Sequence, residues 1–204
     1  MIDRYLMPLV ARALGPPARA LAARGVTADQ ITLAGFAVGL MAPLLLWAGW
    51  MGAALAAILA NRIADGLDGM VARHRGPTDR GAFLDIALDF VFYASVPVGF
   101  ALADPPANAL PAAILIFAFV GTMSSFLAFS VIAGQRQMRA ADYPTKGIYY
   151  LGGLTEGAET IAVFAAMCLW PGLFPILAYG FAAACAVTTL TRWHMGWHAF
   201  GDRR

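Results

Sequence analysis

Six apolar runs, most of them joined by short links, lie along the chain at residues 30–50, 51–73, 81–102, 107–133, 151–170 and 173–194. About 20 apolar residues in helical form cross a bilayer, so each run has the length of a membrane-spanning helix. Only 13% of the residues are charged and the mean hydropathy is +0.68, whereas soluble domains carry about 25% charged residues. The sequence therefore predicts an all-α integral membrane protein. Its residues 1–204 form one domain, with a six-helix bundle over 30–194.

The basic residues predict how these helices cross the membrane. Six spans place both termini on the same side, and every Lys and Arg except Arg62 falls at that set of helix ends. The opposite links, near residues 49–52, 103–107 and 170–172, contain no Lys or Arg. Because cytoplasmic loops carry the excess of basic residues, we expect both termini and the helix ends near residues 73–80 to be cytoplasmic.

Residues 1–24 are too charged to span a membrane. Four arginines alternate with apolar residues at helical spacing, which predicts an amphipathic helix lying in the membrane interface. An ordinary cytosolic arm is the alternative interpretation. Gly15-Pro16-Pro17 is expected to break this helix or to start a second short one. The segment lacks the long apolar core and the cleavage site of a signal peptide.

Four aspartates, Asp65, Asp68, Asp85 and Asp89, lie where the second and third spans meet. Spacings of three and four residues put each pair on one helical face. Only residues 74–80 separate the two helices, so we expect antiparallel neighbours whose acidic faces meet. Acidic groups at membrane depth cost roughly 2.5 kcal/mol or more each, and a metal ion is the counter-charge that best satisfies a carboxylate cluster. The alternative is a structural ion-pair cluster with nearby arginines.

Two divalent ions held by shared carboxylates commonly stabilise charge on a phosphoryl group during displacement. Arg73 adds a fork of donors for phosphate oxygens. Gly66 and Gly69 weaken their helix by roughly 1 kcal/mol each relative to alanine, which we interpret as making room for a ligand. The residues therefore favour a phosphate-containing substrate beside metal, close to the lipid interface.

The segment from Asp65 to Asp89 resembles the sequence motif of the CDP-alcohol phosphatidyltransferase family. The matching positions are Asp65, Asp68, Gly69, Ala72, Arg73, Gly81, Asp85 and Asp89, with no departure. The resemblance implies transfer of a phosphatidyl group from a CDP-linked lipid, such as CDP-diacylglycerol, to a small alcohol with release of CMP. It also implies six transmembrane helices around a polar cavity open to the cytoplasm, and a homodimer in the membrane that binds no nucleic acid.

The resemblance also implies roles for individual residues. Mg²⁺ or Mn²⁺, as two ions, would be held by Asp65, Asp68, Asp85 and Asp89. Asp85 and Asp89 are the candidate catalytic residues, and whether Asp89 acts as the base or only as a metal ligand stays open. The CDP moiety would lie against Thr32, Gly69, Ala72, Arg73 and Gly81. For Thr32, a hydroxyl bonded within its own helix is an equally weighted alternative.

The acceptor alcohol is not identified by the sequence. Candidate acceptor residues are Lys146, Glu156 and Glu159, with Arg136, Arg139, Thr155 and Thr160 nearby. Glu156 and Glu159 share a helical face in an apolar run, so they either bind the acceptor or pair with Lys146 or Arg192. Residues 146–160 do not match the acceptor signatures associated with the glycerophosphate or inositol-phosphate branches. They resemble a small bacterial inner-membrane branch whose alcohol is unassigned.

Other polar side chains favour structural interpretations. His194 and His198 have a spacing that can hold a metal but lack a third ligand, so an interfacial belt is favoured. Tyr143, Tyr149 and Tyr150 are interpreted in the same way rather than as a cage for a quaternary ammonium group. Cys168 and Cys185 are expected to be small buried hydrophobes.

Two other functions compete with the enzyme. Intramembrane acids can form the cation pathway of a transporter or another cation-binding membrane protein. Transporters, however, commonly show internal repeats and charge near the midplane, and this chain shows neither. A catalytically idle scaffold is the third interpretation, and the intact motif argues against it.

Overall fold

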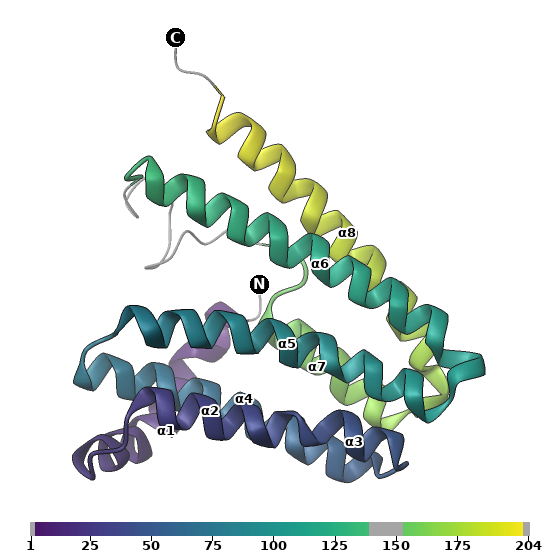
Figure 1. Cartoon of the computed structure of the whole chain (residues 1–204), viewed down its shortest axis with the longest axis horizontal. Helices are drawn as coiled ribbons and strands as arrows, with labels where there is room; N and C mark the ends of the chain where they lie inside the picture. The colour runs from purple at the N-terminus through teal and green to yellow at the C-terminus, as the bar shows by residue number, and fades with distance from the viewer. Residues whose placement is uncertain (1–2, 139–152, 202–204) are drawn as a thin grey trace.

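The computed structural model is helical throughout its described part, residues 3–138 and 153–201, with side chains described from residue 10 onward (Figure 1). Arg139, Lys146, Tyr143, Tyr149 and Tyr150 lie outside the described residues. The helices are α1 (Asp3–Ala23), α2 (Ala28–Gly39), α3 (Met41–Trp47), α4 (Met51–Arg75), α5 (Asp79–Ala103), α6 (Pro105–Gln135), α7 (Gly157–Leu169), the 3₁₀ turn η2 (Pro171–Leu173) and α8 (Phe174–Ala199). The all-α prediction is confirmed.

Helices begin where the sequence offers caps. The Thr27 side chain caps α2 and forms a reciprocal capping box with Gln30. Asp104 separates α5 from α6, and Pro105 starts α6 because proline has no N–H to leave unpaired at a first helical position. The first run is divided at Leu40 into α2 and α3, and Pro43 removes one backbone donor there.

Four segments in the described residues are long and apolar enough to cross a membrane: Ala28–Trp47, Asp79–Ala103, Pro105–Gln135 and Pro171–Ala199. The helix α4 has 25 residues, but it carries the polar motif. The helix α7 has 13 residues, or about 20 Å at 1.5 Å per residue, which is shorter than the hydrocarbon core. The predicted fifth span at 151–170 thus begins as a helix only at Gly157. Six spans remain a prediction.

The expected break at Gly15-Pro16-Pro17 is wrong, because α1 runs unbroken from Asp3 to Ala23. Packing compensates for the prolines: Ala18 is fully buried against Met70 and Val71 of α4. Two adjacent prolines remove only two backbone donors, a local cost that tertiary contact can offset. One face of α1 therefore packs against the protein, and its location at the membrane interface remains a prediction.

The helices form two groups that share a core. In Figure 1, α2 to α5 run roughly parallel to one another, while α6 and α8 lie side by side and slope away from α5. Buried Ile58, Phe92, Leu115 and Phe164 belong to one cluster that joins both groups. Small residues such as Gly35, Gly39 and Gly121 let helices approach closely: a Cβ added at Gly35 would lie 2.5 Å from the Ala64 side chain.

Candidate active site

The motif lies on two helices joined by the short link at residues 76–78. Gly76 ends α4 with a φ of 98°, a left-handed value that glycine adopts without strain. Thr78 begins α5 by accepting a hydrogen bond from the Gly81 backbone N–H at 3.0 Å. The two helices run antiparallel, as expected. The pair α2–α3 packs against both of them, and the facing acidic side chains lie between α4 and α5.

Three of the four aspartates form one cluster. Asp65, Asp68 and Asp85 each offer a carboxylate oxygen, and these oxygens lie within 4.8 Å of one another. Asp68 is buried, at 5% exposure, and accepts a 2.5 Å hydrogen bond from the Thr32 hydroxyl. Carboxylate oxygens converging on one point are the ligands that Mg²⁺ and Mn²⁺ prefer. The donor set present therefore fits a divalent cation.

Asp89 is engaged differently, because it pairs with Arg62 of α4. The Arg62 Nη2 atom donates to one Asp89 oxygen at 2.5 Å, and Nη1 donates to the other at 3.2 Å. Arg62 lies farther from Asp65, at 3.7 Å. Arg62 precedes Asp65 by one helical turn in the sequence, but its shorter, two-point contact is with Asp89. The described site thus contains a three-carboxylate cluster next to a carboxylate–guanidinium pair.

A cavity of about 330 Å³, which we call the hairpin cavity, opens beside the cluster. Six residues singled out by the sequence line it: Thr32, Asp68, Gly69, Ala72, Gly81 and Asp85. A Cβ added at Gly69 would meet only Arg73 Nη1, at 3.8 Å, so this wall is open. At Gly81 an added Cβ would come within 3.1 Å of Asp29 and Thr78 oxygens. Glycine therefore keeps the chain close to polar atoms at this edge of the cavity.

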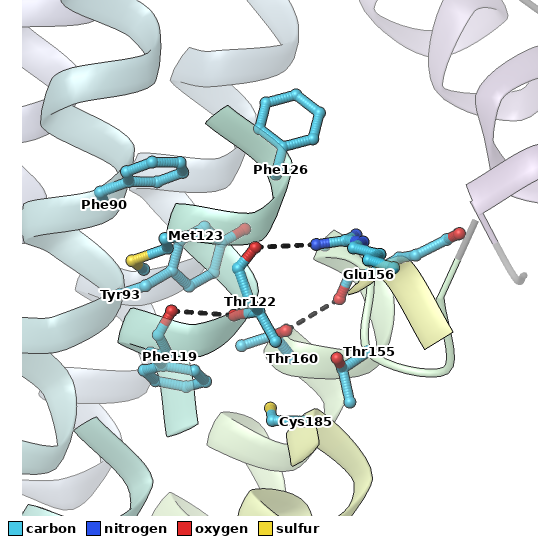
Figure 2. A pocket seen from close by; sticks show the side chains of 12 residues that line it. Phe90, Tyr93, Phe119, Thr122, Met123, Phe126, Thr155, Glu156, Thr160 and Cys185 are labelled. Atoms are coloured by element: carbon cyan, nitrogen blue, oxygen red, sulfur yellow. Dashed lines mark hydrogen bonds between the residues drawn. The ribbon is translucent and has the colours of Figure 1, made fainter. Parts of the chain in front are cut away.

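A second cavity, of about 230 Å³, lies between α5, α6, the start of α7 and α8, and we call it the four-helix cavity. Figure 2 shows its lining, with aromatic side chains from α5 and α6 facing polar groups near α7. Arg192 donates to the Thr122 backbone oxygen at 2.9 Å, and Thr160 donates to the Glu156 backbone oxygen at 2.8 Å. Tyr93 lines this cavity and accepts a 3.0 Å hydrogen bond from Arg62, which connects the cavity to Asp89.

Comparison with known proteins is consistent with this geometry. The profile of the CDP-alcohol phosphatidyltransferase family matches residues 25–193. The chain belongs to this family. It is 52% identical over 192 residues to the inner membrane protein YnjF of Escherichia coli K12, covering 94% of this chain and 93% of YnjF.

Solved structures of the phosphatidylinositol phosphate synthase PgsA1 of Mycobacterium tuberculosis share the fold. The complex with CDP-DAG matches with a TM-score of 0.67 and 25% identity over 95% of this chain and 98% of that one. The complex with manganese and citrate matches with the same TM-score and identity over 94% and 93% of the two chains. This chain is therefore a membrane enzyme of the phosphatidyltransferase type, and the transporter interpretation is not favoured.

The surroundings of Gly66 and Arg73 differ from those expected from the sequence. A Cβ added at Gly66 would come within 2.9 Å of Leu14 Cδ1, so the room left there is filled by α1 rather than by a ligand. That interpretation of Gly66 is corrected, since the docking of α1 could not be read from the motif. Arg73 is exposed and is not among the residues that line the hairpin cavity, whereas Arg75 and Arg80 are.

The acceptor candidates separate into two sets. Thr155, Glu156 and Thr160 line the four-helix cavity. Glu159 does not line it, and Arg136 donates to the Phe200 backbone oxygen at 3.0 Å, at the end of α8. Buried Cys168 and Cys185 are confirmed as buried thiols, and His194 and His198 contact each other edge to face at 4.4 Å between ring centroids.

Several residues of the site escaped the sequence analysis. Tyr93 lies one turn beyond Asp89 on α5, so the i, i+4 spacing could have placed it on the acidic face. Thr122 and Phe126 of α6 carried no such signal, because their contact with the site depends on how α6 crosses α5. Asn61, buried next to Arg62 in an apolar run, was a detectable polar exception.

Proposed function

We propose that this enzyme transfers a phosphatidyl group from CDP-diacylglycerol to the hydroxyl of a small alcohol, releases CMP, and requires a divalent metal ion. The observation that carries the proposal is the junction of the three-carboxylate cluster and the hairpin cavity, since Asp68 and Asp85 belong to both. The CDP-DAG complex and the manganese complex of the mycobacterial relative support the same donor and metal class.

The chain's residues can be assigned parts of this reaction. Asp65, Asp68 and Asp85 would hold Mg²⁺ or Mn²⁺, and such an ion stabilises charge on the phosphate oxygens of the donor. The hairpin cavity would hold the cytidine diphosphate moiety, with Gly69, Ala72 and Gly81 leaving space for it. The exposed Arg73 would have to turn toward this cavity to contact a phosphate. Thr32 orients Asp68 through its hydrogen bond, whether or not Thr32 also contacts the cytosine ring of the donor.

Asp89 is the candidate general base. The acceptor hydroxyl loses its proton to the carboxylate as its oxygen forms a bond to the lipid-side phosphorus, and the bond from that phosphorus to the CMP oxygen breaks. Asp89 lines the small space around the cluster, and Arg62 links it to the four-helix cavity by contacting both Asp89 and Tyr93. We assign the four-helix cavity to the acceptor for this reason.

The acceptor's class follows from the charges around that cavity. Among the described lining residues, Arg192 is the only cation and Glu156 the only carboxylate. A phosphorylated acceptor calls for several cations, so we favour an unphosphorylated alcohol, with Glu156 contacting its hydroxyl or amine groups. Glu159 and Lys146 remain candidate contributors from outside this lining. We place the enzyme in the bacterial inner membrane, with the site cytoplasmic, as a homodimer.

Purified protein with CDP-diacylglycerol and Mn²⁺ would test the proposal, with CMP release measured for one alcohol at a time. Glycerol 3-phosphate, inositol 1-phosphate, inositol, serine, choline and a phospholipid headgroup alcohol form the panel. We expect an unphosphorylated member to stimulate release and Asp89→Asn to abolish it. Stimulation by a phosphorylated alcohol alone would contradict the acceptor class. Absence of metal-dependent CMP binding would contradict the reaction itself.

A further inference from the structure

Arg62 is held from every side, which is unusual for an arginine between two membrane helices. A guanidinium has five N–H donors, and here all five have an acceptor. Nε and Nη2 donate to Asn61 Oδ1 at 2.9 and 2.6 Å. Nη2 and Nη1 each donate to one Asp89 oxygen, and Nη1 also donates to the Tyr93 hydroxyl. The guanidinium carbon also lies 4.8 and 5.0 Å from the Phe92 and Tyr93 ring centroids.

The acceptors are themselves fixed. The Asn61 amide donates to the Gly35 backbone oxygen at 3.0 Å, so its Oδ1 points toward Arg62. Phe92 is fully buried, and the Arg62 side chain is only 15% exposed. A planar fork bound at all its donors has little freedom to turn aside. Both Asp89 oxygens are therefore committed to a rigid partner.

The position of this fork has a consequence for the metal centre. Its Nη1 lies 3.7 Å from Asp65 and its Nη2 lies 2.5 Å from Asp89, so one guanidinium contacts both carboxylates. A second cation bound by Asp65 and Asp89 would lie within a few ångströms of this guanidinium. Two cations within a few ångströms repel strongly at low dielectric, so the guanidinium and a second ion are alternatives.

We infer that Arg62 is a positioning residue that takes the place of a second metal ion: in the substrate-free enzyme one divalent ion binds between Asp65, Asp68 and Asp85, and Arg62 keeps Asp89 out of its ligand shell. This inference rests on the proposed metal-dependent function. It assigns Asp89 to the acceptor's hydroxyl, oriented by Arg62, and not to the metal.

Counting bound ions tests the inference without any substrate. Nucleotide-free, detergent-purified protein is titrated with Mn²⁺, and the free ion is measured by its electron paramagnetic resonance signal. We expect one Mn²⁺ per chain in the wild type and two in Arg62→Met, because the uncovered Asp65 and Asp89 carboxylates then gain an ion. A merely structural role of Arg62 would not raise the number of ions.

Two control variants alter Asp85 and Asp89, which lie one turn apart on α5. Asp85→Asn removes a ligand and should weaken Mn²⁺ binding by about 10-fold or more, in line with losses at metal shells. The double variant Arg62→Met/Asp89→Asn replaces a buried ion pair by neutral groups, which folds are known to tolerate. It should bind one ion within about threefold of wild-type affinity, since the ligands are unchanged.

Three results would overturn the inference: two ions per chain in the wild type, only one ion in Arg62→Met, or a double variant that loses the ion as Asp85→Asn does. Failure of the proposed function is a separate result. It would show as one bound Mn²⁺ with no CMP release from CDP-diacylglycerol for any alcohol.

Discussion

The hairpin cavity and the four-helix cavity are built in contrasting ways. The hairpin cavity takes most of its lining from one continuous segment, residues 68–85, which supplies carboxylates, two arginines and small residues. The four-helix cavity collects its lining from α5, α6, α7 and α8 and is largely aromatic. If the hairpin cavity binds the donor and the four-helix cavity binds the acceptor, as we propose, the difference teaches that donor binding is local in sequence, whereas acceptor binding depends on how distant helices cross.

The largest effect is expected from removing a carboxylate shared by the cluster and the hairpin cavity. Asp68→Asn should lower CMP release by at least about 100-fold, because one metal ligand and one partner of Thr32 are lost together. The measurement is CMP release at saturating Mn²⁺, with circular dichroism to verify the helices. Activity close to wild type would mean that the cluster does not hold the ion.

A bulky residue in the hairpin cavity should distinguish the function of this cavity from that of the four-helix cavity. Ala72→Leu adds volume to the lining of the hairpin cavity and should weaken CMP binding by about 10-fold or more, at roughly 1.4 kcal/mol per factor of ten. Ala72→Ser, which stays small, is the control. Calorimetric titration of CMP checks both. Mn²⁺ binding without nucleotide should be unchanged, and an equal loss there would show that the variant disturbs the cluster.

In the four-helix cavity the matched pair is Glu156→Gln and Glu159→Gln, since only Glu156 is in the lining. Glu156→Gln should raise the KM for the acceptor by about 10- to 150-fold, since one lost charge-assisted hydrogen bond costs about 1.5 to 3 kcal/mol. Binding of CMP should not change. Equal effects of the two substitutions on the KM would indicate that the carboxylates act on structure rather than on the acceptor.

The smallest expected effect concerns the docking of α1, outside both cavities. Gly66→Ala places a methyl group 2.9 Å from Leu14 Cδ1, and the overpacking cost of about 1 kcal/mol is offset by a similar gain in helix propensity, so the net change in stability should be below about 1 kcal/mol. Leu14→Ala should relieve that strain, so the double variant should be less destabilised than the sum of the two single variants. Thermal unfolding in detergent measures all three. Strict additivity would show that the two residues do not interact in solution.

How well each region could be predicted from the sequence depends on whether its contacts are local or join distant helices. Asp65, Asp68, Asp85 and their glycines could be placed from helical spacing, because a hairpin with a short link leaves little choice of geometry. Arg62 could not be assigned to Asp89 in this way, since that contact depends on the rotation of α4 against α5. The continuous α1 was missed for a related reason: the burial of Ala18 against α4 outweighs the local signal of two prolines.

The short link between α4 and α5 also bears on how such an enzyme can diversify. Gly76 and Thr78 close the hairpin with their own backbone and side-chain bonds, and neither takes a partner from α6, α7 or α8. Substitutions on those three helices can remodel the four-helix cavity while the cleavage chemistry stays intact. A lineage could thus acquire a new head group by drift in the distal helices, keeping one inherited unit for activating the nucleotide-linked lipid.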